Sequence, residues 1–367
     1  MVLNGNTETR RIDSLQGFRA ILFFLIFIFH TSMVGNTSGS TVYRILCAGG
    51  GTEAVAFFFG LSGFVVALHS RRESLRFSSS LQLCRKKVKR FYGLHIFFSI
   101  IVIPTMIYTV VREPVYSIVK FIINVLLLQS WFPDEQMWLS YNSVAWFLST
   151  LTFLCLFIVP LHYICNRIEQ RTSSIKIYAA ILAVDWLIAF LLAFLLGNFC
   201  NNIQYWLYAF PPARLMDYIS GFVLGRIFVL QKNHRLSATA ATYLEVVAAS
   251  MIILYLLLFP YVPAPFARAA IYQPGAAFAI YIFAIGKGQI SKILSSPVMV
   301  KLGGNSLYYM MSHQVILRYC ALIHKQLVKR GMISCEIIWI IIAFALTLIS
   351  KPVYEGLCSK FRKMKKV

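Results

Sequence analysis

Long apolar runs alternate with short polar stretches along the whole chain, and this pattern predicts a bundle of membrane-spanning helices. A helix needs about 20 predominantly apolar residues to cross a bilayer. Runs of about this length lie at residues 20–36, 53–69, 92–111, 145–165, 176–196, 214–230, 239–259, 267–286, 304–323 and 334–350. A further apolar stretch, 117–131, is short and contains Lys120. We therefore interpret 112–144 as an outer segment that carries a partial or re-entrant helix, covered by protein.

The distribution of Lys and Arg predicts the orientation of these helices. With ten spans and a cytoplasmic N-terminus, 25 of the 35 basic residues fall in cytoplasmic loops and only 7 in outer loops. Counting 117–131 as an eleventh span removes this bias, although basic residues normally accumulate on the cytoplasmic side. The sequence thus predicts an all-α, polytopic transmembrane bundle of about ten spans with both termini in the cytoplasm. We expect one integral-membrane domain, 1–350, followed by a basic cytoplasmic tail, 351–367.

Composition supports this class and excludes others. The chain has 367 residues, of which 59% are hydrophobic and 13% charged, and its mean hydropathy is +0.70. Soluble domains carry about 25% charged residues, so a soluble enzyme, a disordered protein and a disulfide scaffold all fit poorly. The net charge of +22 lies between apolar runs, where it favours contact with anionic lipid and not with nucleic acid. The eight cysteines lack metal-site spacing, and we predict no metal.

The first apolar run holds the sharpest catalytic candidate. Arg19 lies at its cytoplasmic start, and His30 follows 11 residues later, about 16 Å deeper in a helix. Eleven residues make about three turns, so the two side chains share a helix face. A neutral imidazole inside a membrane protein can act as a general base. Alternatively, His30 is a structural residue satisfied by a neighbouring helix, and the pattern by itself favours neither reading.

Other polar residues near the spans are weaker candidates. In the second run, Gly63 permits close helix packing together with Gly60, and Ser62 can form a hydrogen bond across that contact. The cluster that contains Lys86, Lys87 and Arg90 precedes the third run. It suits either anionic lipid or the phosphates of a bound ligand, with lipid favoured from the pattern alone.

Two later runs add ionisable groups. Arg214 and Asp217 are spaced i, i+3, so they can pair on one face of a helix near the outer side, either as a structural pair or as a grip for a sugar hydroxyl. His313 lies about nine residues into the ninth run. Asp185 and Glu245 are also intramembrane acids, and we expect them to be structural partners of Arg226 or of hydroxyl groups.

Taken together, several segments resemble the membrane-bound acyltransferase-3 family, whose multi-pass enzymes O-acylate glycans. Each motif is loose alone, but their order and spacing agree with the family from about residue 10 to 350. The segments are Arg10–His30 (RRIDSLQGFRAILFFLIFIFH), Ala56–Phe64 (AFFFGLSGF), Lys86–Tyr92 (KKVKRFY), Ser130–Pro133, Asn142–Leu148 (NSVAWFL), Pro211–Gly225 (PPARLMDYISGFVLG) and Leu302–Gln314 (LGGNSLYYMMSHQ). The chain departs from the family pattern in the basic motif, where Lys86 and Lys87 replace the first two arginines and Gly93 stands in place of the usual final Pro. It also departs after the Trp motif, where Leu151 replaces a Glu that is common in the family.

The resemblance implies an O-acyltransferase of the cell (inner or plasma) membrane. It would move an acyl group, usually acetyl, from acetyl-CoA or another acyl-CoA to a sugar hydroxyl of a surface or lipid-linked polysaccharide. Acyl-CoA would be a co-substrate, with no tightly bound cofactor. A macrolide, lipid or peptidoglycan sugar is an alternative acceptor, and a transporter or flippase is a less favoured alternative because no repeated halves are visible.

The resemblance also implies roles for the candidate residues. His30 would act as base or acyl carrier, with Arg19 orienting it or binding the donor and His313 as a second polar group. The remaining assignments follow the same motifs: Lys86, Lys87 and Arg90 for the acyl-CoA phosphates; Asn142, Trp146, Arg214 and Asp217 for the acceptor side; Ser62 and Gly63 for the cavity or packing.

Overall fold

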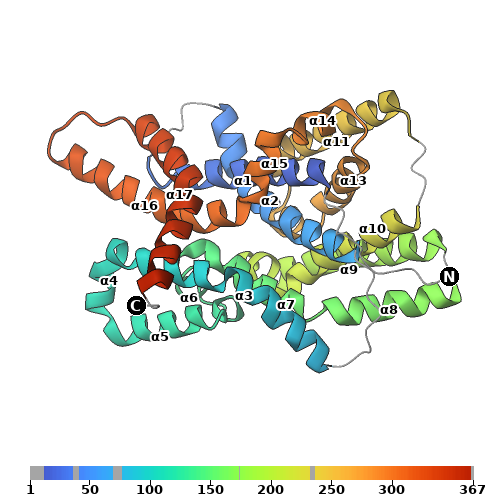
Figure 1. Ribbon diagram of the computed structural model, residues 1–367, viewed down its shortest axis with the longest axis horizontal. Coiled ribbons are helices and arrows are strands. Elements are labelled where there is room, and N and C mark those ends of the chain that lie inside the picture. The colour runs from blue at the N-terminus through green and yellow to red at the C-terminus, as the bar shows by residue number, and fades with distance from the viewer. Residues whose placement is uncertain (1–11, 36–40, 69–76, 173, 232–235, 365–367) are drawn as a thin grey trace.

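The computed structural model describes residues 12–35, 41–68, 77–172, 174–231 and 236–364, and every regular element in these ranges is a helix (Figure 1). The α-helices are α1 (Asp13–Thr31), α2 (Thr41–Ala67), α3 (Phe77–Ile101), α4 (Ile107–Arg112), α5 (Pro114–Val125), α6 (Glu135–Trp138), α7 (Trp146–Cys155), α8 (Ile158–Arg171), α9 (Ile175–Phe199), α10 (Leu215–Leu230), α11 (Ala238–Leu258), α12 (Ala264–Ala269), α13 (Tyr272–Ile285), α14 (Gln289–Leu294), α15 (Pro297–Gly304), α16 (Ser306–Lys329) and α17 (Glu336–Met364). Six short helical turns connect them: η1 (Ile103–Met106), η2 (Gln129–Trp131), η3 (Ser143–Ala145), η4 (Tyr205–Ala209), η5 (Pro211–Arg214) and η6 (Phe259–Tyr261).

The helices confirm an all-α, multi-pass membrane architecture. In the described ranges, six helical segments are long and apolar enough to cross a membrane, and two bent helix pairs raise this number to eight. The two pairs are α3 with η1–α4, bent by 44°, and η3–α7 with α8, bent by 43°. The predicted runs 214–230 and 304–323 form α10 and α16, which do not meet this criterion. The ten-span topology and the cytoplasmic placement of the termini therefore stay predictions.

The structure also shows which parts of the chain on either side of the third predicted run, 92–111, are helical. α5 has 12 residues and is about 18 Å long, too short to cross a hydrocarbon core of about 30 Å by itself. A partial helix in 112–144 is therefore confirmed. The basic cluster that precedes the third predicted run is itself helical, because α3 begins at Phe77. Residues 69–76 lie outside the described ranges.

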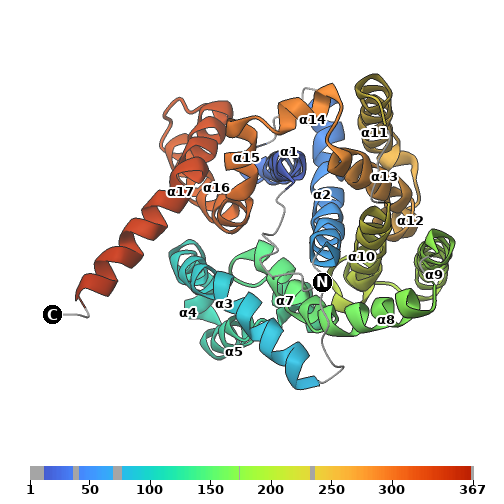
Figure 2. The same cartoon turned by 45° about the vertical axis from the view of Figure 1, so that its right-hand side comes forward.

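α1 lies at the centre of the fold, between α2 on one side and α15 and α16 on the other (Figure 2). α2 in turn packs closely against α10. A Cβ atom on Gly221 would lie 1.9 Å from the carbonyl oxygen of Gly60, and one on Gly63 would lie 2.1 Å from that of Tyr218. Gly60 and Gly63 therefore both lie at this close contact between α2 and α10. Ser62 does not bond across this contact, since its hydroxyl donates to Phe58 O within α2, at 2.7 Å.

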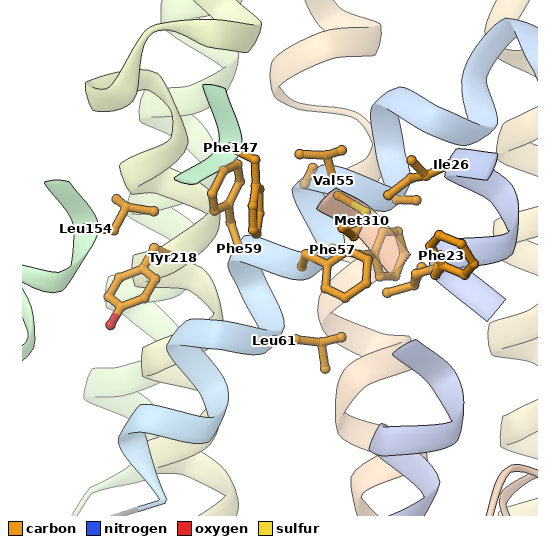
Figure 3. Packing of buried hydrophobic residues seen from close by; sticks show 14 of the residues in the cluster. Phe23, Ile26, Val55, Phe57, Phe59, Leu61, Phe147, Leu154, Tyr218 and Met310 are labelled. Carbon is orange, nitrogen blue, oxygen red and sulfur yellow. The ribbon is translucent and has the colours of Figure 1, made fainter. Parts of the chain in front are cut away.

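Aromatic and aliphatic side chains fill the space between these central helices. Phe59 of α2 stacks on Phe147 of α7 with ring centroids 4.7 Å apart. On the other side of α2, Phe57 lies close to Phe23 of α1 and Met310 of α16 (Figure 3). These contacts connect α1, α2, α7 and α16, the helices that carry half of the predicted site residues.

Buried polar pairs tie other helices together, and they differ from the predicted ones. Arg226 of α10 pairs with Glu169 of α8, with both carboxylate oxygens 2.6 Å from its Nη2 atom, so the expected pairing with Asp185 or Glu245 is wrong. The carboxylate of Glu245 instead accepts the backbone N–H groups of Gly288 and Ser291 at the start of α14. It thereby satisfies donors that have no partner within that helix.

Candidate active site

The structure brings together the two histidines that lie 283 positions apart in the sequence. The Nε2 atom of His313 in α16 lies 3.2 Å from the Nδ1 atom of His30 in α1. Their ring centroids are 5.0 Å apart. Sequence reasoning proposed each histidine separately, but no spacing in the chain could predict their contact. This His30–His313 pair is the only place among the described residues where two predicted catalytic side chains meet.

The hydrogen bonds of the pair define which ring nitrogens carry protons. His30 Nδ1 lies 2.9 Å from Ile26 O, and His313 Nδ1 lies 2.9 Å from Tyr309 O. A carbonyl oxygen only accepts, so both Nδ1 atoms donate. In two neutral rings, His313 Nε2 then accepts a second, shared bond from His30 Nδ1–H. His30 Nε2 is left with a lone pair and no hydrogen-bond partner among the described residues.

His30 lies in the last turn of α1, not in the middle of a span. The predicted run 20–36 is displaced, since α1 covers Asp13–Thr31. The helix ends at Thr31, with Ser32 as its C-cap, whose N–H bonds to His30 O. Aromatic side chains nevertheless lie against both imidazole rings. The ring centroid of Phe29 lies 4.9 Å from that of His30, and the ring centroid of Phe23 lies 5.8 Å from that of His313. Such apolar surroundings strengthen electrostatic interactions at the pair.

The segment around η3 holds α16 next to the histidine pair. The side-chain amide of Asn142 donates to Met311 O at 2.8 Å, two residues before His313. Arg318 of α16 donates to the hydroxyl of Ser143. Asn142 is buried, and its Oδ1 atom has no hydrogen-bond partner among the described residues. Sequence reasoning selected Asn142 but missed Arg318 and Ser143, although an Arg inside a span was itself an indication.

Trp146 does not reach the histidine pair through any contact that the structure shows. Its ring packs 4.7 Å from Tyr208 and 6.2 Å from Trp138. Its backbone carbonyl accepts the hydroxyl of Ser130 at 2.9 Å. Trp146 therefore anchors the start of α7 within an aromatic cluster.

Arg214 and Asp217 form the predicted pair, 3.1 Å apart and almost fully buried. Arg214 also donates to the carbonyls of Leu207 and Arg268, and Asp217 Oδ1 accepts the hydroxyl of Tyr272 at 2.6 Å. The adjacent cavity holds about 20 Å³, enough for about one water molecule. The described geometry is that of a buried polar network, and its role on the acceptor side stays a prediction.

The predicted donor-side residues lie on two separate helices. Arg19 is half-buried in α1, three turns before His30, so the hydrogen bond that orients His30 comes from His313 instead. Lys86 and Arg90 are exposed on α3, one helical turn apart, with half-buried Lys87 between them. In the described structure, no hydrogen bond or ion pair joins Arg19, Lys86 or Arg90 to the histidine pair. Among the described residues, no three His, Cys, Asp or Glu side chains group in a way that could hold a metal ion.

Comparisons with known proteins agree on one family. The model of the acyltransferase domain of the acyltransferase-3 family matches residues 12–351. The acyltransferase MdmB of Streptomyces mycarofaciens is 25% identical over 326 residues, an alignment that covers 84% of this chain and 80% of that protein. No solved structure matches the chain. Because the family model covers nearly the whole chain, this protein belongs to the acyltransferase-3 family and is a membrane acyltransferase, which requires an acyl donor and an acyl acceptor.

Proposed function

We propose that the protein transfers an acetyl group from acetyl-CoA to a sugar hydroxyl of a cell-surface or lipid-linked polysaccharide. The observation that carries this proposal is the His30–His313 pair, because it leaves His30 Nε2 as an unpartnered base. Family membership supplies the acyl transfer itself. The choice of acetyl, and of a polysaccharide hydroxyl, rests on the sequence motifs.

In the proposed reaction, His30 Nε2 removes the proton of the acceptor hydroxyl. The oxygen attacks the thioester carbonyl, a C–O bond forms, and the C–S bond of acetyl-CoA breaks. The proton then passes from His30 to the departing thiolate, so the ring returns to its neutral form. His313 accepts a hydrogen bond from His30 Nδ1–H, which stabilises the transient imidazolium in the way that a carboxylate does in a catalytic triad.

The donor and acceptor would approach this base from opposite sides of the membrane. Lys86, Lys87 and Arg90 extend the positive charge of α3 on the predicted cytoplasmic side, where they would bind the phosphates of acyl-CoA. Arg19 would contribute a further cation at the start of α1. Asn142 supports an acceptor role best among the predicted outer residues, because its Oδ1 atom is free beside α16.

The experiment is expression in a glycan-producing host, with the mass of its surface polysaccharide compared with that of an empty-vector strain. We expect an added acetyl mass that mild base removes and that is absent with His30→Ala at equal protein level. General-base catalysis is worth about 10²–10⁴-fold in rate, so residual transfer should be at most about 1%. Wild-type transfer by His30→Ala would reject the assignment of His30.

A second assay separates the acceptor from the chemistry. Isolated membranes are incubated with acetyl-CoA labelled in the acetyl group, and labelled products are resolved as polysaccharide, lipid or small molecule. Label in polysaccharide supports the proposed acceptor. Label that depends on His30 but enters a lipid or small molecule keeps the acyl transfer and rejects the polysaccharide.

A further inference from the structure

A cavity of about 220 Å³ lies between α1, α2, α11 and α13, away from the histidine pair. Leu22 and Leu25 of α1 form one wall, and Met251 of α11 and Gly275 of α13 form another. Neither His30 nor His313 lines it. An apolar cavity of about 150 Å³ holds one benzene molecule, so this one has room for a chain of about eight carbons.

One acidic side chain points into this otherwise apolar space. Glu53 of α2 lines the cavity and is only 4% exposed, and neither of its carboxylate oxygens has a hydrogen-bond partner among the described residues. No described cation forms an ion pair with it either, since the neighbouring Arg214 pairs with Asp217. An unsatisfied buried carboxyl group costs free energy unless a partner arrives.

The phenolic protons of the cavity are already used in other hydrogen bonds. The lining contains two further hydroxyl groups, those of Tyr255 and Tyr272. Tyr255 donates its proton to Ala267 O at 2.7 Å, and Tyr272 donates to Asp217 Oδ1 at 2.6 Å. A phenol has one proton to donate. Neither phenol therefore donates to Glu53, whose two carboxyl oxygens have no hydrogen-bond partner among the described residues.

The cavity opens toward the apolar surface of the bundle. Leu254 and Leu258 of α11 and Ile271 beside α13 line it and are 54%, 47% and 46% exposed. α11 belongs to a candidate membrane span of which only 17% is buried inside the protein. In a bilayer these side chains face hydrocarbon, so a ligand enters from the lipid and must itself be largely apolar.

We propose that this cavity binds a membrane-dissolved aliphatic alcohol, with the hydroxyl group on Glu53 and the chain against α1, α11 and α13. A hydroxyl group suits a carboxyl group in either protonation state, because it both donates and accepts. The site is separate from the proposed acetyl transfer at His30 and does not depend on it.

The test is photolabelling of the full-length protein in lipid nanodiscs with an eight-carbon primary alcohol that carries a diazirine. The matched probe is the same chain without the hydroxyl group. Labelling is scored on α11 and α13, because diazirines react readily with carboxyl groups and the loss of Glu53 would itself remove label from α2. Labelling of lipid-facing α9 in the same sample corrects for partitioning into the membrane.

We expect the alcohol to label α11 and α13 about fivefold more than the hydrocarbon, the effect of about one net hydrogen bond. Glu53→Met should reduce this ratio to about one. Gly275→Leu should block both probes, since a Cβ there meets only Met251 Cε, at 3.6 Å, and the longer side chain extends into the cavity. Gly356→Leu is the matched control, because nothing lies within 4 Å of its Cβ position, and it should leave labelling unchanged.

The wild-type comparison of the two probes needs no variant, so it decides the proposal even if Glu53→Met folds poorly. Equal labelling by the alcohol and the hydrocarbon overturns it. So does an alcohol preference that survives in folded Glu53→Met, or labelling of α11 and α13 that Gly275→Leu does not reduce.

Discussion

Two carbonyl oxygens determine the chemistry available to the histidine pair. Ile26 O and Tyr309 O each accept a hydrogen bond from an Nδ1–H group, which leaves both Nε2 atoms as acceptors. One of them is used by the neighbouring ring and the other, on His30, is not. In the proposed reaction, the backbone of two helices thus prepares His30 as a base before any substrate binds, and His313 would act as a positioning residue.

Replacing His313 tests this role. His313→Leu removes the acceptor for His30 Nδ1–H, and we expect kcat to fall by about 10- to 100-fold, the effect of one lost buried hydrogen bond to a charged group. His313→Gln retains an acceptor oxygen, so it should lose less. Initial rates in membranes at varied acetyl-CoA concentrations separate the effect on kcat from the effect on KM. The KM for the donor should stay unchanged. An equal loss in both variants, or a rise in KM alone, contradicts the positioning role.

At the scale of elements, helices approach closely wherever a glycine or a buried ion pair permits it. Gly221 and Gly63 bring α10 and α2 into backbone contact, and the Arg226–Glu169 pair fastens α10 to α8. Arg226 also donates to Ala67 O near the end of α2, at 3.2 Å. α2 and α10 are therefore held at both the glycine contact and this cationic contact.

Gly221→Ala tests the glycine contact. The new Cβ would lie 1.9 Å from Gly60 O, so the helices must separate, and we expect a loss of about 1–3 kcal/mol in stability. Gly275→Ala is the control, because its Cβ finds ordinary contact distances, and alanine favours a helix. Thermal unfolding in detergent, followed by a thiol-reactive dye on the buried cysteines, should show a lower Tm only for Gly221→Ala. An unchanged Tm there would mean that the two helices are not packed as described.

The Arg226–Glu169 pair gives a second prediction at this scale. Arg226→Met leaves Glu169 without its bidentate partner, and we expect a destabilisation of about 3 kcal/mol. Adding Glu169→Leu should restore much of that stability, because the unpaired charge is then gone as well. The same thermal unfolding assay compares the single and double variants. If the double variant is less stable than Arg226→Met, the unpaired charge of Glu169 is not the cause of the loss, and the expectation is wrong.

At the scale of the whole molecule, the basic residues and the apolar helices together predict how the protein lies in the membrane. The loop between α16 and α17 falls on the outer side in the ten-span prediction, and the end of α17 falls in the cytoplasm. α17 itself continues past residue 350 and projects beyond the other helices (Figure 2). Each of these two regions contains a native cysteine.

Labelling of these cysteines tests the orientation. Cys335 is exposed and Cys358 is half-buried. A membrane-impermeant maleimide should label Cys335 in intact cells and Cys358 only after permeabilisation. Cys335→Ser should remove the label from intact cells, which controls for the other cysteines. Labelling of Cys358 in intact cells would reverse the predicted topology.

The sequence by itself determined the class of protein and the positions of its helices, because the length of an apolar run and its local period do not depend on what the run packs against. Each of the ten predicted runs is largely helical in the described residues, and the pairing of Arg214 with Asp217 was predicted correctly. The ends of the helices were less accurate, as α1 shows, since a helix stops where its caps and neighbours allow.

Only the tertiary structure decided which distant residues meet. It paired His30 with His313 and Arg226 with Glu169, and it left Glu53 unpartnered in an apolar cavity. Periodicity places a side chain on a face of its own helix, but the crossing angle and depth of a second helix decide which side chain faces it. The chemistry of the pair depends on that contact, and so it became visible only when α1 and α16 were placed side by side.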